Sequence, residues 1–100
     1  ITDWSGIEQN KHWMWHRQLH VFELPFYYIE YGIAQLGAIG VWKNYKENPQ
    51  KGLEGYKAAL KLGYTKSIGE IYEAGHIKFD FSSKYIKELV EFIKDELKEL

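Results

Sequence analysis

Apolar residues recur every three or four positions in the last part of the chain, with lysine and glutamate between them. From residue 83 onward these apolar positions are Ile86, Leu89, Ile93, Leu97 and Leu100. This spacing places them on one face of an α-helix. Ser82 stands where an N-cap residue is expected, and Phe81 and Ile86 occupy the positions of a hydrophobic staple. The pattern predicts an amphipathic final helix.

Start and stop signals predict four further helices. The segment Ser5–Glu8 has the form of a capping box, Ser-x-x-Glu, and predicts a first helix that continues to about Leu24. That helix should end before Pro25, because a residue preceding proline avoids the α region. A second helix is expected from Phe26 to about Lys46.

The pair Asn48-Pro49 combines an N-cap with proline at the first helical position, and predicts a third helix that ends at Gly63. A second capping box, Ser67–Glu70, opens a short helix that should close near Gly75. Residues 76–81 are expected to be extended or irregular. With no strand pattern found, the fold class predicted for residues 1–100 is all-α, in a single domain.

Three glycines, Gly32, Gly37 and Gly40, fall inside the second predicted helix. Each costs a helix about 1 kcal/mol relative to alanine. Such positions indicate that something approaches the backbone closely, either a neighbouring helix or an extended peptide. Close helix packing is the favoured explanation.

Composition narrows the class of protein. The chain has 13 basic and 14 acidic side chains, so its net charge of −1 gives no reason to expect nucleic acid or an anionic membrane as partner. The absence of cysteine excludes disulfides and thiolate metal sites, and fits a reducing, cytoplasmic compartment. No apolar run reaches the ~18 residues of a membrane span.

Aromatic residues make up 17% of the chain, and Ile1 stands first while the one methionine is Met14. We therefore expect a piece of a longer polypeptide that meets a partner segment through part of its aromatic surface.

Glu8, His12, His16 and His20 follow one another in steps of four residues. On a continuous helix they would form one stripe, and a histidine pair at i, i+4 can chelate zinc. A free-standing helical metal-binding or interaction module is therefore one hypothesis. A solvated or partner-facing stripe is the simpler interpretation, because three histidines on a straight helix span two turns and do not converge readily.

The segment "HVFELPFYYIEYG", residues 20–32, places one histidine close to three tyrosines. Tyr28 and Tyr31 are three residues apart, so a helix would place both phenols on nearly the same face. A phenol is protonated at neutral pH and can donate a hydrogen bond to developing negative charge. His20 could add a second donor from before the proline bend. The alternative is that the rings pack and the hydroxyls reach water.

Three segments resemble the C-terminal end of oligoendopeptidase F-type zinc metallopeptidases, which are relatives of the thimet oligopeptidases. They are "HVFELPFYYIEYGIAQLGAIGVWKNY", "YKAALKLGYTKSIGEIYEAG" and "IKFDFS". The most specific part is a histidine followed eight residues later by Tyr-x-x-Tyr, here His20, Tyr28 and Tyr31. The resemblance covers the chain from about Trp13 to its end.

The resemblance implies a multi-helix segment of a larger, mostly helical, two-lobed catalytic domain that cleaves short peptides. In that family one zinc ion is held by a His-Glu-x-x-His helix and a distant glutamate, and the motif glutamate is the general base. None of the four histidines here is followed by glutamate, so the resemblance places zinc and base on an upstream part of the same polypeptide.

The resemblance also assigns roles to residues of this chain. Tyr31 would donate to the oxyanion of the tetrahedral intermediate, and Tyr28 would hold the substrate backbone or assist Tyr31. His20 would bind the substrate beside the scissile carbonyl, and Tyr27 and Gly32 would belong to the substrate-binding surface. No residue of this chain is expected to bind the metal.

Overall fold

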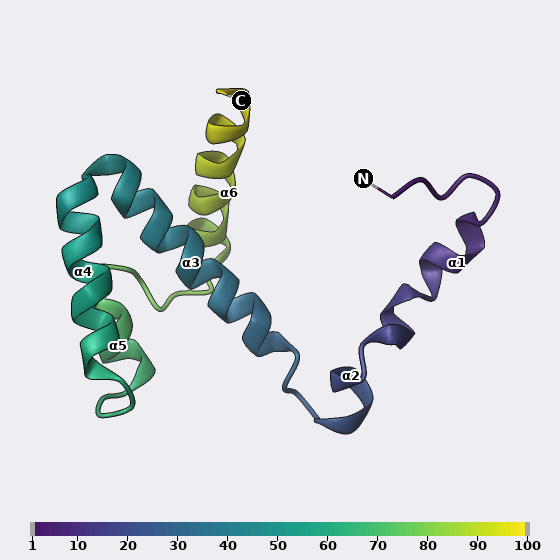
Figure 1. Cartoon of the computed structure of the whole chain (residues 1–100), viewed down its shortest axis with the longest axis horizontal. Helices are drawn as coiled ribbons and strands as arrows, with labels where there is room; N and C mark the ends of the chain where they lie inside the picture. The colour runs from purple at the N-terminus through teal and green to yellow at the C-terminus, as the bar shows by residue number, and fades with distance from the viewer. Residues whose placement is uncertain (1, 100) are drawn as a thin grey trace. The chain divides into compact units, whose positions relative to one another are not determined.

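The computed structural model describes residues 2–99, and within them every regular element is a helix. The predicted all-α class is therefore confirmed. Residues 2–99 contain six α-helices, labelled in Figure 1, and a 3-10 turn, η1 at Met14–Arg17, lies between the first two. The helices are α1 (Glu8–His12), α2 (His20–Glu23), α3 (Ile29–Glu47), α4 (Pro49–Leu62), α5 (Ile68–Ala74) and α6 (Ser83–Lys98). None of the helices in the described part combines the length and apolar character that crossing a bilayer requires.

The described residues form two compact units, one ending at Gly32 and the other beginning at Ile33. The boundary falls inside α3, whose first turn belongs to the first unit. The first unit holds α1, η1 and α2, and the second holds most of α3 together with α4, α5 and α6.

The prediction of one continuous helix from Ser5 to Leu24 is wrong. Three short elements replace it, and none of them contains a buried residue. The capping box is not formed either, because Ser5 donates to Asp3 and Ile7 occupies the N-cap position. Short helices are marginal unless a packed face supports them, and these segments have no such face in the first unit.

The second long helix begins three residues later than predicted, at Ile29 rather than Phe26. Leu24 is extended, with φ −129° and ψ 96°, as expected for a residue before proline. Phe26 has φ 61°, a left-handed conformation that cannot start an α-helix. Tyr27 and Tyr28 therefore lie in a turn that precedes α3.

The start signals of the later helices are confirmed. The Asn48 side chain accepts a hydrogen bond from the Lys51 backbone N–H at 3.0 Å, and Pro49 opens α4. The capping box at the start of α5 has both of its reciprocal hydrogen bonds. Ser82 accepts from the Tyr85 N–H at 3.2 Å at the start of α6. In each case the side chain satisfies a backbone donor that the helix itself leaves free.

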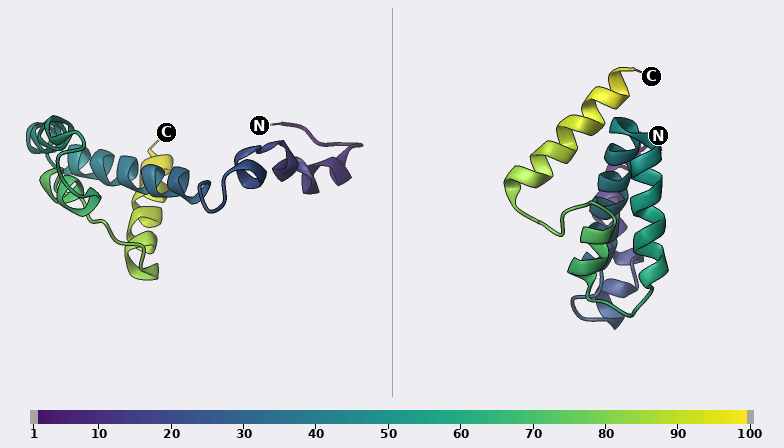
Figure 2. Two further views of the ribbon diagram at one scale, coloured as in Figure 1. Left: turned by 90° about the horizontal axis from the view of Figure 1, so that it is seen from below. Right: turned by 90° about the vertical axis from the view of Figure 1, so that its left-hand side faces the viewer.

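Two of the three α3 glycines allow close packing in the second unit. A Cβ atom at Gly37 would lie 2.5 Å from the hydroxyl of Tyr72, and one at Gly40 would lie 3.1 Å from the Ile77 side chain. Tyr72 belongs to α5, which packs against α4, as the two views of Figure 2 show. The expectation that these glycines accept a close neighbour is correct, and the neighbour is tyrosine or isoleucine rather than a helix backbone.

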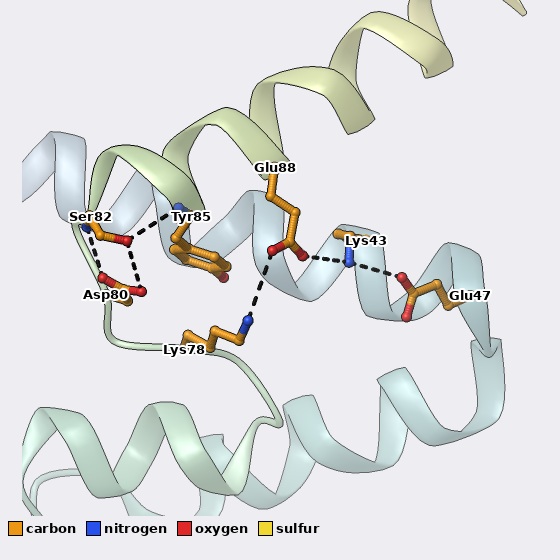
Figure 3. A network of polar contacts seen from close by, with 7 residues as sticks. All are labelled: Lys43, Glu47, Lys78, Asp80, Ser82, Tyr85 and Glu88. Atoms are coloured by element: carbon orange, nitrogen blue, oxygen red, sulfur yellow. Dashed lines mark hydrogen bonds and ion pairs between the residues drawn. The ribbon is translucent and has the colours of Figure 1, made fainter.

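Helix α6 packs on α3 through aromatic rings and ion pairs. The rings of Trp42 and Phe92 meet edge to face with centroids 4.9 Å apart. Lys43 lies between two carboxylates, 2.9 Å from Glu47 on its own helix and 3.0 Å from Glu88 on α6 (Figure 3). These contacts fix α6 against the middle and end of α3.

The apolar stripe of α6 is only partly buried. Leu89 is 1% exposed, Ile86 and Ile93 are half-buried, and Leu97 is 62% exposed. Leu100, the last member of the stripe, lies outside the described residues.

Few large apolar side chains are buried among the described residues. Only Tyr85 and Leu89 fall in this class. By contrast, Trp13 is 60% exposed and Phe26 is 96% exposed. Apolar surface of this extent is typical of a face that meets another polypeptide segment.

Candidate active site

A proline turn brings residues 20–31 together in the first unit. After α2 the chain leaves helical geometry at Leu24 and passes Pro25 and Phe26. It then closes with a hydrogen bond from the Tyr27 N–H to the Leu24 carbonyl at 3.2 Å. Tyr31 follows in the first turn of α3. Because the chain reverses over so few residues, a side chain from α2 can reach those of the turn and of early α3.

The side chains of His20 and Tyr31 meet directly. The Tyr31 hydroxyl lies 3.1 Å from Nε2 of the His20 imidazole, within hydrogen-bond distance. The two rings are nearly perpendicular, at 80°, with centroids 5.5 Å apart. The Nδ1 atom of His20, on the other side of the ring, is buried and has no hydrogen-bond partner.

Tyr27 and Tyr28 complete a four-ring cluster, which we call the His20 cluster: His20, Tyr27, Tyr28 and Tyr31. Tyr27 stacks on the imidazole with an interplanar angle of 12° and centroids 5.9 Å apart. Tyr28 lies 6.2 Å from the imidazole and 5.4 Å from the Tyr31 ring, measured between centroids. The three side chains for which the resemblance implies a catalytic role, His20, Tyr28 and Tyr31, therefore lie together in this cluster.

The cluster is accessible from outside. Tyr27, Tyr28 and Tyr31 are 38%, 43% and 50% exposed, and His20 is half-buried. A hollow of about 220 Å³ opens beside it. The hollow is lined by His20, Tyr28 and four apolar residues, Val21, Leu24, Phe26 and Ile29. A mostly apolar hollow with a few polar groups at its edge has the composition of a small-ligand or side-chain pocket.

The environment of Tyr31 favours its neutral form. Partial burial raises the pKa of the Tyr31 phenol above its ordinary value of 10.0, and the nearby Tyr27, Tyr28 and Glu30 raise it further. At neutral pH the hydroxyl therefore keeps its proton and can act as a donor. Hydrogen-bond donation by the neutral phenol, rather than attack by a phenolate, is the chemistry that this arrangement allows.

Gly32 directly follows Tyr31 in α3. A Cβ atom built there would meet nothing within 4 Å, so no contact within residues 2–99 explains the glycine. In this respect Gly32 differs from Gly37 and Gly40. The open space beside Gly32 is therefore next to Tyr31 in the chain.

The proposed histidine stripe does not form, because it requires a continuous helix. His12 ends α1, His16 lies in η1 and His20 begins α2. The His16 ring packs against Trp13 and Trp15, with centroids 5.4 and 3.9 Å away. Within residues 2–99, no three His, Asp or Glu side chains are placed to hold a metal ion.

Sequence reasoning missed a larger hollow in the second unit, of about 540 Å³. Residues of α3, α4 and α5 and of the loops beside them line it, and they include small residues together with Tyr56, Tyr64 and Tyr72. The spacing of Ala34, Gly37 and Ala38 on one face of α3 was the available signal. Apart from the three tyrosines its lining is apolar, with no histidine, carboxylate or amine beside the phenols as in the His20 cluster.

A comparison with known protein families, curated proteins and solved structures finds no match to this chain.

Proposed function

We propose that this chain supplies substrate-binding and transition-state-stabilising side chains to a zinc-dependent endopeptidase of the oligoendopeptidase F type, which cleaves short peptides in the cytoplasm. The observation that carries the proposal is the His20 cluster. A protonated phenol lies 3.1 Å from an imidazole nitrogen on an accessible surface, with a second phenol beside it. The resemblance in residues 20–31 gives the reaction class.

Tyr31 is the proposed oxyanion donor. Its raised pKa keeps the hydroxyl protonated at the pH of catalysis, so it can donate to the oxygen that gains charge as the carbonyl is attacked. A donor aimed at charge that develops only in the transition state typically contributes about 10²–10³ in kcat.

The neighbouring residues are proposed to hold the peptide. Tyr28 can donate to the substrate backbone from the edge of the 220 Å³ hollow, and the apolar lining can accept one substrate side chain. Tyr27 supports the imidazole by stacking. The open space beside Gly32 lets an extended peptide approach the start of α3.

The metal and the general base are proposed to belong to an upstream part of the same polypeptide. The described residues do not fit a zinc site, since they place no group of three potential ligands together. When bound, the zinc of such an enzyme polarises the carbonyl and activates a water molecule. This chain's own contribution is to bind and orient the peptide and to donate hydrogen bonds to it.

The exposed aromatic surface is where the rest of such a polypeptide would pack. Trp13, Trp15 and Phe22 are between 49% and 60% exposed, whereas large aromatic side chains in a protein core are mostly buried. Burial of these rings by an upstream segment would also supply the packed face that α1, η1 and α2 lack.

Substitution of Tyr31 in the full-length polypeptide tests the proposal. Tyr31→Phe should lower kcat on a fluorogenic peptide by about 100-fold, with little change in KM, because it removes one transition-state donor. Tyr64→Phe is a matched control, since Tyr64 is fully exposed and lies in the other unit. Full activity in Tyr31→Phe would refute the assignment.

Two simpler observations bear on the same proposal. The isolated 100-residue chain should not cleave peptides even with added zinc, and cleavage by the purified chain would contradict this. The sequence upstream of this chain should contain His-Glu-x-x-His, and a full-length sequence without it would remove the zinc-peptidase assignment.

A further inference from the structure

The contact between His20 and Tyr31 leaves open which of the two groups donates the hydrogen bond. Either the phenol donates to a bare Nε2, or an Nε2–H donates to the phenolic oxygen. The two arrangements have opposite consequences. In the first, the only proton of Tyr31 is directed at the imidazole; in the second, that proton remains free to point outward.

The environment of the other imidazole nitrogen, Nδ1, favours a proton on Nε2. A histidine tautomer is set by the hydrogen bonds of both ring nitrogens. Within the described residues Nδ1 of His20 is buried and has no hydrogen-bond partner, so a proton on Nδ1 would be a buried donor without an acceptor, which is costly. Stacking of Tyr27 on the imidazole holds the ring in place.

His20 also has no nitrogen left with which to reach a substrate. Nε2 faces the Tyr31 hydroxyl, and Nδ1 is closed off from solvent. A ring that binds a carbonyl directly would need at least one nitrogen directed outward. The tyrosine hydroxyls of the cluster, in contrast, belong to side chains that are 38–50% exposed.

We infer that His20 is a positioning residue, whose Nε2–H donates to the Tyr31 oxygen and so leaves the phenolic proton free for the substrate. This rests on the proposed function, and it changes the role of the histidine from substrate contact to support of Tyr31. A phenol that accepts one hydrogen bond is oriented by it and donates its own proton more strongly. Stacking with Tyr27 orients the imidazole of His20, and the hydrogen bond from the imidazole orients the phenol of Tyr31.

A double-mutant cycle in the full-length polypeptide separates this inference from direct substrate contact. Tyr31→Phe is expected to lower kcat about 100-fold, and His20→Ala about 10-fold, with KM little changed in either variant. If His20 acts only through Tyr31, the double variant should match Tyr31→Phe within about 2-fold. A double variant about 1000-fold below wild type means that the two effects multiply, and it overturns the inference.

The tautomer itself gives a readout that does not depend on activity. With ¹⁵N only in histidine, two-bond ¹H–¹⁵N spectra of the full-length polypeptide distinguish Nε2–H from Nδ1–H, and His20 is assigned by the signal lost in His20→Gln. Nε2–H is expected, with its shift altered in Tyr31→Phe; Nδ1–H would overturn the inference. If Tyr31→Phe is fully active, the proposed function is refuted. The tautomer still shows whether His20 or Tyr31 donates the hydrogen bond between them.

Discussion

The hydroxyl of Tyr72 on α5 donates a hydrogen bond to the Ile33 carbonyl on α3 at 3.2 Å, across the space left by Gly37. This contact links residues 39 positions apart and helps to join α5 to α3. It exists because Gly37 has no side chain.

Gly37→Ala is expected to destabilise the second unit by about 1–3 kcal/mol. Overpacking costs about 1–3 kcal/mol and loss of the Tyr72 hydrogen bond about 1 kcal/mol, against a gain of about 1 kcal/mol in helix propensity. Denaturant unfolding monitored by circular dichroism measures the change. Gly69→Ala is the control, because a Cβ there meets nothing within 4 Å. In a Tyr72→Phe background the cost should shrink, and an unchanged cost would contradict the contact.

Glu88 makes stability depend on pH in the acid range. The hydrogen bond from Lys43, followed by the charges of Lys43 and Lys78, holds its pKa below the ordinary 4.5. Because the unfolded chain then takes up the proton first, stability is fully present above about pH 4.5 and is lost as pH falls through the folded-state pKa. Glu88→Gln should flatten this part of the stability curve.

The expected size of the Glu88 effect is small, because the side chain is 42% exposed and water screens the pair. Glu91→Gln is the matched control on the same helix, since Glu91 pairs with Lys94 only within α6. Equal acid slopes for Glu88→Gln and Glu91→Gln would show that the bridge to α3 contributes nothing.

The buried phenol of Tyr85 should destabilise the protein at high pH. Burial raises the pKa of Tyr85 above 10.0, so the unfolded chain loses its phenolic proton first as pH rises. Stability should therefore fall above about pH 10, and Tyr85→Phe should reduce that fall. Thermal unfolding between pH 9 and 12 measures the effect, with Tyr64→Phe as the exposed control. A Tyr64→Phe variant that lost the dependence equally would contradict the explanation.

The 100-residue chain is expected to bind zinc weakly. His12 and His16 lie on separate elements, and the His16 ring is packed by two tryptophans. Titration calorimetry should show no site tighter than about 10⁻⁵ M, because single imidazoles do not supply the three or four ligands of a structural or catalytic site. Tight binding that His16→Ala abolishes would restore the metal-binding module as a hypothesis.

The helices that could be predicted are those whose ends carry their own signals. Asn48, Ser67 and Ser82 each cap the helix that follows, as the sequence predicts. The same reasoning failed at Ser5, where the serine hydrogen-bonds to Asp3 instead. A capping box starts a helix only if a packed face then supports the turns beyond it, and that information is not local.

The His20 cluster was predictable in its members and not in its contacts. The spacing of Tyr28 and Tyr31, and a histidine before a proline, indicated that the three side chains could meet. The left-handed Phe26 and the stacked Tyr27 were not predicted, because both depend on how the chain reverses after Pro25. The buried Nδ1 of His20 follows from that reversal as well.

The sequence by itself determined the all-α class, the starts of the last three helices and which aromatic residues lie near His20, because caps, proline and apolar spacing act over a few positions. Only the tertiary structure decided that the first predicted helix breaks, that Gly37 accepts the ring of Tyr72, and that the His20 imidazole faces Tyr31 through Nε2. These features depend on contacts between segments that are distant in the chain or on the path of a turn, and no local pattern specifies either.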